Sequence, residues 1–239
     1  MPIKEEELRS AMLLGESGLD QLHRAHVAVF GVGGVGGYVC EALARAGVGE
    51  LTLIDNDTVS PSNINRQIIA LHSTVGQLKT EVMKARILDI NPDCRVHTLN
   101  LFYLPETADA IPLKDFSYIV DAIDTVSGKI ELAVRANEQN IPLICAMGTG
   151  NKLSPLGFRV TDLSKTSGCP LARVMRRELR ARGISHLKVV YSEEPAADLD
   201  QDVCAAMSGK LPPASLPFVP GVAGLILAGE VIRELCKIE

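Results

Sequence analysis

The chain has 239 residues, of which 46% are hydrophobic and 22% charged, and its formal net charge at pH 7 is −5. This length fits one large α/β domain with ample core. The negative charge argues against a globally basic nucleic-acid-binding protein, so any RNA contact must use a local patch. The longest apolar run, Val219 to Gly229, is too short to span a bilayer, and the N-terminal segment has no apolar core of a signal peptide.

The cysteines are scattered and form no C-x-x-C pair, which argues against a zinc ribbon and indicates reduced thiols in a cytoplasmic protein. They are Cys40, Cys94, Cys145, Cys169, Cys204 and Cys236. Cys169 and Cys204 fall in expected loops, where a redox role is open, but free structural thiols are the favoured interpretation.

The first expected element is a helix over residues 8–23, with apolar Leu8, Met12, Leu19 and Leu22. Arg9 stands among its charged residues. The pattern alone favours a solvated arginine at this position.

A glycine-rich turn follows the first expected strand, Val27 to Phe30. Gly31, Gly33 and Gly36 fit G-x-G-x-x-G, Gly34 lies in the same turn, and helix-forming residues begin at Tyr38. A strand, a glycine turn and a helix N-terminus together offer free N–H groups to a phosphate. This order therefore predicts nucleotide binding.

The second expected strand, Glu50 to Asp55, ends in an acid. Asp55 follows the glycines at the spacing of a ribose-binding carboxylate, although a helix cap or turn former is the alternative. The next segment, Asn56 to Gln67, is polar and is broken by Pro61. Its dense polar side chains indicate contacts to a triphosphate and a substrate rather than a simple connector.

A helix is expected from Val75 to about Ile90, with Lys79 in its first turn. A cation there is unfavourable for the helix dipole, and a bound anion would remove the conflict. An exposed lysine without a ligand is the alternative.

The fourth expected strand, Phe116 to Asp124, is apolar until it ends in Asp121 and Asp124. Open α/β sheets bind ligands at strand carboxyl ends, and carboxylates are hard ligands suited to Mg²⁺. Asp124 is the preferred Mg²⁺ ligand, whereas Asp121 is expected to be partly structural. Capping of the next helix is the alternative for either residue.

The remaining pattern predicts a Rossmann-like, doubly wound, mostly parallel sheet with an antiparallel extension. The chain is expected to be one domain, with an N-terminal helix (1–25), a nucleotide-binding core (26–150) and a substrate-side and dimer-packing part (151–239). The other expected elements are strands at 95–100, 141–147, 158–162 and 188–192, helices at 105–111, 127–139, 170–183 and from 218, and a mobile loop or crossover at 193–217.

Four arginines of the expected helix 170–183 share one face, at positions i, i+3, i+4 and i+7. They are Arg173, Arg176, Arg177 and Arg180. A solvated basic face is the common meaning of such a stripe, and an RNA phosphate surface is the alternative.

With these motifs in view, the chain resembles the ThiF/MoeB-type members of the ubiquitin-activating-enzyme superfamily. The resemblance rests on Gly31-Val-Gly-Gly-Val-Gly, Leu53-Ile-Asp-Asn-Asp, Ser62-Asn-Ile-Asn-Arg-Gln67, Val75-Gly-Gln-Leu-Lys79 and Asp121-Ala-Ile-Asp124. Within that group it is most similar to the tRNA threonylcarbamoyladenosine dehydratases, through Asn91-Pro-Asp-Cys-Arg-Val, Asp162-Leu-Ser-Lys-Thr, Pro170-Leu-Ala, Val190-Tyr-Ser-Glu-Glu and Phe218-Val-Pro-Gly.

The resemblance implies ATP-dependent dehydration of threonylcarbamoyladenosine in tRNA through an acyl-adenylate. It places the glycine turn at the ATP phosphates and Asp55, with Asp57 nearby, at the ribose; Asn63, Arg66 and Lys79 neutralise phosphate charge, and Asp124 sits with Mg²⁺. Arg9 then matches an arginine that reaches the neighbouring subunit's site, which implies a homodimer and replaces the solvated interpretation. A monovalent cation and a sulfur-relay protein partner are further expectations.

Three alternatives differ in class. An adenylyltransferase would activate the C-terminal Gly-Gly of a ubiquitin-like sulfur carrier, but the zinc cysteine pairs common in such enzymes are absent. A nicotinamide dehydrogenase would use the same glycine turn but leave residues 62–67 and Lys79 without a role. A non-catalytic nucleotide sensor is the third alternative.

Overall fold

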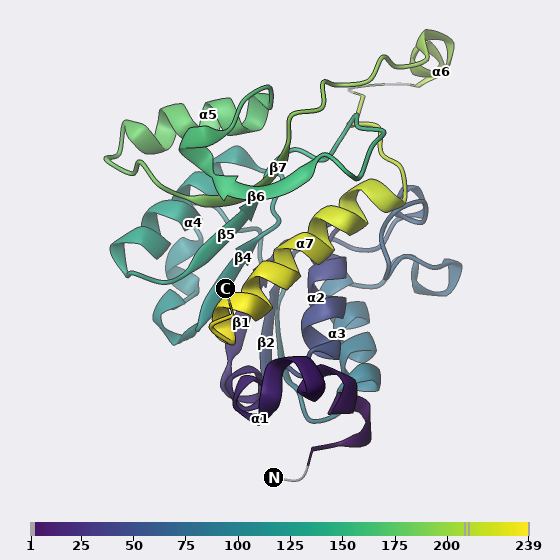
Figure 1. The fold of residues 1–239 in the computed structure, drawn as a ribbon. Helices are drawn as coiled ribbons and strands as arrows, with labels where there is room; N and C mark the ends of the chain where they lie inside the picture. Colours follow the sequence, from purple (N-terminus) through teal and green to yellow (C-terminus); the bar gives the residue numbers. More distant parts are fainter. Residues whose placement is uncertain (1–2, 208, 210, 239) are drawn as a thin grey trace.

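Seven strands form a single sheet in the order β3-β2-β1-β4-β5-β7-β6 in the computed structural model, which describes residues 3–207, 209 and 211–238 (Figure 1). The strands are β1 (His26–Phe30), β2 (Glu50–Ile54), β3 (Arg95–Leu99), β4 (Tyr118–Asp121), β5 (Leu143–Ala146), β6 (Phe158–Asp162) and β7 (Lys188–Ser192). All neighbouring pairs are parallel except β6 and β7. The predicted Rossmann-like sheet with an antiparallel extension is confirmed.

Helices cover both faces of the sheet because alternate strand residues are apolar on each side. Val27 and Val29 of β1 are buried in one cluster, whereas Ala28 and Phe30 belong to another. The first face carries α1 (Leu8–Arg24), α2 (Gly36–Arg45), α3 (Lys79–Ile90) and α7 (Phe218–Leu235), and the second carries α4 (Val126–Glu138) and α5 (Pro170–Arg180). The small residues of α7, among them Ala223 and Ala228, are buried against α2 and the sheet.

Several expected boundaries were wrong. The helix expected from Val75 begins at Lys79, because residues 75–78 form a turn in which Val59 N donates to Gln77 O at 2.8 Å. The expected helix 105–111 is only a 3-10 turn, Ala108–Ala110. The fourth strand ends at Asp121, so Asp124 lies in the following loop.

Residues 193–217, expected to be a mobile loop or crossover, contain α6 (Gln201–Ala206) at the end of an extended stretch (Figure 1); positions 208 and 210 lie outside the described residues. The segment returns over the sheet. There Asn65 Nδ2 donates to Ser215 O at 3.0 Å, and Ala214 N donates to Asn151 Oδ1 at 2.7 Å. Within the described part of the chain, no helix is long and apolar enough to cross a membrane.

Candidate nucleotide-binding site

A cavity of about 740 Å³ lies at the carboxyl ends of β1, β2, β4 and β5. Open α/β sheets bind ligands at this edge, where the strand order reverses. Its lining includes Gly31, Gly33, Gly34, Asp55, Asp57, Asn63, Arg66, Gln67, Lys79, Tyr103, Asp124, residues 146–150, and Pro212, Pro213 and Ser215. Residues that are far apart in sequence therefore meet at one site.

The glycine turn forms the cavity wall next to the first residue of α2. Gly31 has φ +87°, and a Cβ there would lie 2.7 Å from Ala122 O, so only glycine fits. A Cβ on Gly36 would lie 1.8 Å from Gly31 O. Gly36 does not line the cavity. The missing side chain of Gly36 instead lets α2 pack closely against the turn. Gly31, Gly33 and Gly34 are the glycines that line the cavity.

Asp55, predicted at the ribose, follows β2 and lines the cavity. Its Oδ2 accepts a hydrogen bond from Val32 N at 2.7 Å, and its Oδ1 accepts one from Asp57 N at 2.8 Å. The two backbone donors fix the carboxylate between the glycine turn and the polar segment. The position suits a diol-binding carboxylate, since each oxygen keeps a free lone pair.

Lys79 is the first residue of α3, and its side chain is 7% exposed. Its Nζ lies 2.7 Å from Asp57 Oδ2, while Asp57 itself is 60% exposed. The anion that offsets the lysine at this helix N-terminus is therefore a side chain of the same chain. Both groups line the cavity, so a bound phosphate would meet a cation whose present partner faces solvent.

The polar segment after β2 turns its side chains into the same space. Asn63 is buried, and its Oδ1 accepts from Ser60 N at 3.1 Å. Arg66 Nη1 donates to Ser62 O at 2.8 Å and to Asn65 Oδ1 at 2.9 Å, so its guanidinium rests on neutral oxygens. Arg66 thus has no carboxylate partner among the described residues.

Gln67 was quoted in the motif but received no role in the sequence interpretation. It is 7% exposed and lines the cavity, and its Oε1 is buried with no hydrogen-bond partner among the described residues. Tyr103 also lines the cavity, and its Oη is likewise buried without a hydrogen-bond partner among the described residues. Buried polar atoms of this kind are ordinarily satisfied, so a ligand or water in the cavity is their natural partner.

The carboxylates after β4 are divided between the core and the cavity. Asp124 is exposed in the lining, and among the described residues its carboxylate accepts a single hydrogen bond, from Thr125 Oγ1 to Oδ1 at 3.3 Å. Asp121, predicted to bind cofactor, is fully buried and lies outside the lining. Its Oδ1 instead lies 2.9 Å from Lys129 Nζ, which is also fully buried. The partly structural interpretation of Asp121 matches this placement.

Lys129 is a residue that the sequence interpretation missed. Its Nζ donates to Ile123 O at 3.2 Å as well as pairing with Asp121, and Ile123 N donates to Asp121 Oδ1 at 3.1 Å. The pair therefore fixes the backbone of residues 121–123, which precedes Asp124 and contacts Gly31 through Ala122. A lysine five residues beyond Asp124, on an otherwise apolar helix face, was the available signal.

The predicted arginine stripe is divided in the structure. Arg173, Arg177 and Arg180 are exposed on α5, and Arg177 pairs with Glu178 at 2.7 Å. Arg176 turns inward, and its Nη1 donates to Thr166 O at 2.7 Å. Three arginines therefore remain available on the surface, and Arg176 secures the start of α5.

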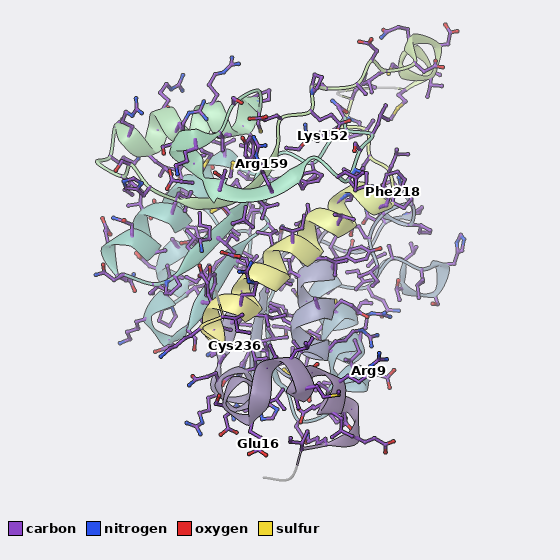
Figure 2. The ribbon with its side chains drawn as sticks, viewed as in Figure 1. Arg9, Glu16, Lys152, Arg159, Phe218 and Cys236 are labelled. Carbon is purple, nitrogen blue, oxygen red and sulfur yellow. The ribbon has the colours of Figure 1, made fainter. Side chains whose placement is uncertain are left out.

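Arg9 lies on α1, in the lower part of Figure 2 and well below Phe218, the first residue of α7. It is exposed and lies outside the cavity lining of its own chain. Any contact between Arg9 and a nucleotide would therefore involve a second subunit.

The cysteines form no disulfide among the described residues. Burial raises the pKa of the Cys40 and Cys145 thiols, so both stay protonated at neutral pH. Cys169, expected in a loop, is buried at the start of α5, and Cys204 lies on α6. The Cys169 placement fits a structural thiol.

The fold and the cavity define a nucleotide-binding α/β protein with a G-x-G-x-x-G turn. Residues 7–239 match the ThiF family, and the chain belongs to that family. It is 44% identical over 238 residues to the tRNA threonylcarbamoyladenosine dehydratase of Bacillus subtilis strain 168, covering 96% of this chain and 94% of that protein.

Solved structures of a related enzyme resemble the whole fold. The Escherichia coli tRNA N6-threonylcarbamoyladenosine dehydratase in complex with AMP has a TM-score of 0.87 and 34% identity, covering 99% of this chain and 98% of the other. The same enzyme in complex with ATP has a TM-score of 0.86 and 32% identity, with the same coverage. The predicted resemblance is confirmed.

The Asp121–Lys129 pair yields a test of what holds the site together. Replacing Lys129 by Met should lower the free energy of unfolding by about 3–5 kcal/mol, because Asp121 would remain as an unpaired buried charge. The double variant Lys129→Met/Asp121→Asn removes that charge and should regain most of the loss. Urea denaturation measures both values.

The matched control is Lys114→Met, since Lys114 is an exposed lysine of a nearby 3-10 turn. It should change stability by no more than about 0.5 kcal/mol. A Lys129→Met protein as stable as this control, or a double variant no better than the single one, would contradict the assignment.

Proposed function

We propose that this protein is an ATP-dependent tRNA threonylcarbamoyladenosine dehydratase. One observation carries the proposal: Lys79, Arg66 and Asn63 meet Asp124 around the glycine turn, in a single cavity. A dehydrogenase has no need of that cationic set, whereas a triphosphate does. The relatives that match nearly the whole chain carry the dehydratase name.

The chemistry is activation of a carboxylate. The threonyl carboxylate of the modified nucleoside attacks the α-phosphorus of ATP, a P–O bond forms, and pyrophosphate leaves. The carbamoyl group of the same substituent then attacks the acyl-adenylate and expels AMP, which closes a ring with net loss of water. Because the second nucleophile belongs to the substrate, the chain needs no catalytic cysteine.

The cavity residues divide this work. Lys79 and Arg66 neutralise charge that develops on the phosphates, and Asn63 and Gln67 offer amide contacts beside them. The backbone of Gly31, Gly33 and Gly34 approaches the phosphates without interference from side chains. Asp55 binds the ribose hydroxyls, and Asp57 releases Lys79 to the incoming phosphates.

Asp124 is the candidate Mg²⁺ ligand. Mg²⁺ at a nucleotide is ordinarily bound by one or two carboxylates together with phosphate oxygens and waters. The exposed Asp124 carboxylate, with its single weak hydrogen bond among the described residues, fits that donor set. Asp121 does not, because it is fully buried outside the cavity lining and its Oδ1 pairs with Lys129. When bound, Mg²⁺ would supply charge neutralisation on the phosphates. The monovalent cation and the sulfur-relay partner stay predictions of the resemblance.

The exposed arginines Arg173, Arg177 and Arg180 of α5 are the proposed tRNA surface. Leu171, in the first turn of the same helix, lines the cavity, so the arginines lie on the element that borders the site. A chain of net charge −5 needs such a local basic surface to bind RNA. A tRNA substrate and reduced cysteines also support action in the cytoplasm.

A homodimer is part of the proposal because Arg9 cannot serve the cavity of its own chain in this structure. Leu8, Met12 and Leu13 are exposed beside Arg9 on α1, Met12 and Leu13 at 86% each. An apolar surface next to the arginine is suited to burial against a second subunit.

The function is tested with ATP, Mg²⁺ and tRNA bearing threonylcarbamoyladenosine. Mass spectrometry of the digested tRNA should show that nucleoside lighter by one water, and Lys79→Ala and Asp124→Ala should each reduce turnover by at least about 100-fold. Lys84→Ala, on the same helix as Lys79 but outside the cavity lining, should keep normal turnover. Unchanged nucleoside, together with adenylation of a Gly-Gly-ended sulfur carrier, would refute the dehydratase in favour of the adenylyltransferase.

The RNA surface is tested by Arg173→Ala/Arg180→Ala. Each lost phosphate contact should lower the slope of log affinity against log salt by about one, with ATP affinity unchanged. Arg24→Ala, an exposed arginine of α1, is the control. Equal salt slopes for the α5 variant and the wild type would remove α5 from the interface.

Subunit mixing tests Arg9. Arg9→Ala and Asp124→Ala proteins, each inactive alone, should regain about a quarter of wild-type activity after equimolar exchange, because half of the symmetric dimers then hold one intact site. The control pair, Lys79→Ala with Asp124→Ala, should regain none, since both residues serve the cavity of one chain. Recovery in neither mixture would place Arg9 outside the partner's site.

A further inference from the structure

A second cluster of ligand-type side chains lies at the opposite edge of the sheet from the nucleotide cavity. His26 and Glu50 begin β1 and β2, and His97 lies in β3. His97 Nε2 is 2.8 Å from Glu50 Oε1, and His26 Nδ1 is 3.7 Å from the same oxygen. One ligand atom from each residue lies within 4.8 Å of the other two.

Neighbouring groups orient the three side chains. His26 Nε2 lies 2.8 Å from the hydroxyl of Thr52, which is buried, so Nδ1 is the nitrogen left to face Glu50. The Phe116 ring packs on the His26 imidazole in a T-shaped contact, with 4.9 Å between ring centroids. Partners of this kind, which fix the ring and its tautomer, accompany the histidine ligands of metal sites.

We propose that His26, Glu50 and His97 bind one divalent transition-metal ion of the zinc class. Two imidazoles and a carboxylate are a donor set for Zn²⁺, with water in the fourth position, and imidazole disfavours Mg²⁺ and Ca²⁺. Around a tetrahedral Zn²⁺ with bonds of about 2.0–2.2 Å, two ligand atoms lie about 3.4 Å apart. Side-chain shifts of about 1 Å therefore complete the site.

The His97–Glu50 hydrogen bond occupies the position that the ion would take. On binding, the ion replaces the hydrogen between His97 Nε2 and Glu50 Oε1. That proton moves to Nδ1 if the ring is neutral, and it is released to solvent if the ring is an imidazolium. His97 has the freedom for this change because its side chain is 53% exposed, whereas the His26 and Glu50 side chains are 19% and 18% exposed.

Arg95 is the feature that opposes an ion. Its Nε donates to Glu50 Oε2 at 3.2 Å, and its side chain is 71% exposed. The guanidinium therefore uses the oxygen that the histidines do not, and it can turn into solvent. Because the Arg95 cation repels a metal ion and competes for Glu50, removing its charge should strengthen metal binding.

Such an ion would tie the first three strands together at the edge of the sheet. Parallel pairing places His26 opposite Glu50, and Thr52 opposite His97. The site is independent of the proposed function, because none of its residues lines the nucleotide cavity. Metal binding and dehydration of tRNA can therefore succeed or fail separately.

The test uses the full-length protein, stripped with a chelator and titrated with Zn²⁺ and Co²⁺. Calorimetry should show one Zn²⁺ per chain, and bound Co²⁺ should give visible d–d bands without the near-ultraviolet charge-transfer band of a thiolate. His97→Ala should weaken Zn²⁺ binding at least about tenfold, and Arg95→Gln should strengthen it. His186→Ala, which removes another exposed histidine beside a carboxylate, should leave binding unchanged.

Thermal melting provides a second readout, since a ligand that binds only the folded state raises Tm. Zn²⁺ should raise Tm of the wild type and of His186→Ala but not of His97→Ala. The His97 side chain is 53% exposed on the edge strand β3, so its removal should leave the fold intact. Absence of stoichiometric binding, a thiolate band with Co²⁺, or equal Zn²⁺ affinity for the wild type and His97→Ala would overturn the site.

Discussion

The contact between Gly31 and the peptide that follows β4 is the constraint on which the nucleotide site depends. A Cβ on Gly31 would lie only 2.7 Å from Ala122 O, and a Cβ on Gly36 only 1.8 Å from Gly31 O. The chain after β1, the start of α2 and the loop after β4 are therefore stacked with no side chain between them. Any ligand of the glycine turn is held at a set distance from Asp124.

Two lysine–aspartate pairs near this contact have opposite energetic character. Asp121 and Lys129 are fully buried, so separating them would leave an uncompensated charge in the core. Lys79 is only 7% exposed, but its partner Asp57 is 60% exposed, so water can solvate the aspartate when the pair separates. The first pair thus serves as scaffold for the Asp124 loop. In the proposed function, a phosphate replaces Asp57 at Lys79 and the neutral oxygens at Arg66.

Local patterns were sufficient for most of the fold, because strand hydrophobicity, glycine spacing and the polar segment after β2 act over short distances. Element ends were less predictable: residues 75–78 have a helix-like pattern, yet Gly76 and Gln77 pair with Val59 in a turn. The division between Asp121 and Asp124 depends on Lys129, and the inward turn of Arg176 depends on Thr166. Those partners are set by packing of α4 and α5, which no spacing in the sequence encodes.

The two edges of the sheet bring side chains together in different ways. At the carboxyl edge, loops of different strands converge, and the segment 212–215 closes over them, so that edge can enclose a nucleotide. At the amino edge, parallel pairing places His26 opposite Glu50 and His97 opposite Thr52, which brings the three ligand-type side chains close together. Arg9 lies on α1, outside the nucleotide cavity of its own chain. Arg9 can therefore act in the proposed phosphate chemistry only from a second copy of the chain, so the proposed mechanism includes the proposed homodimer.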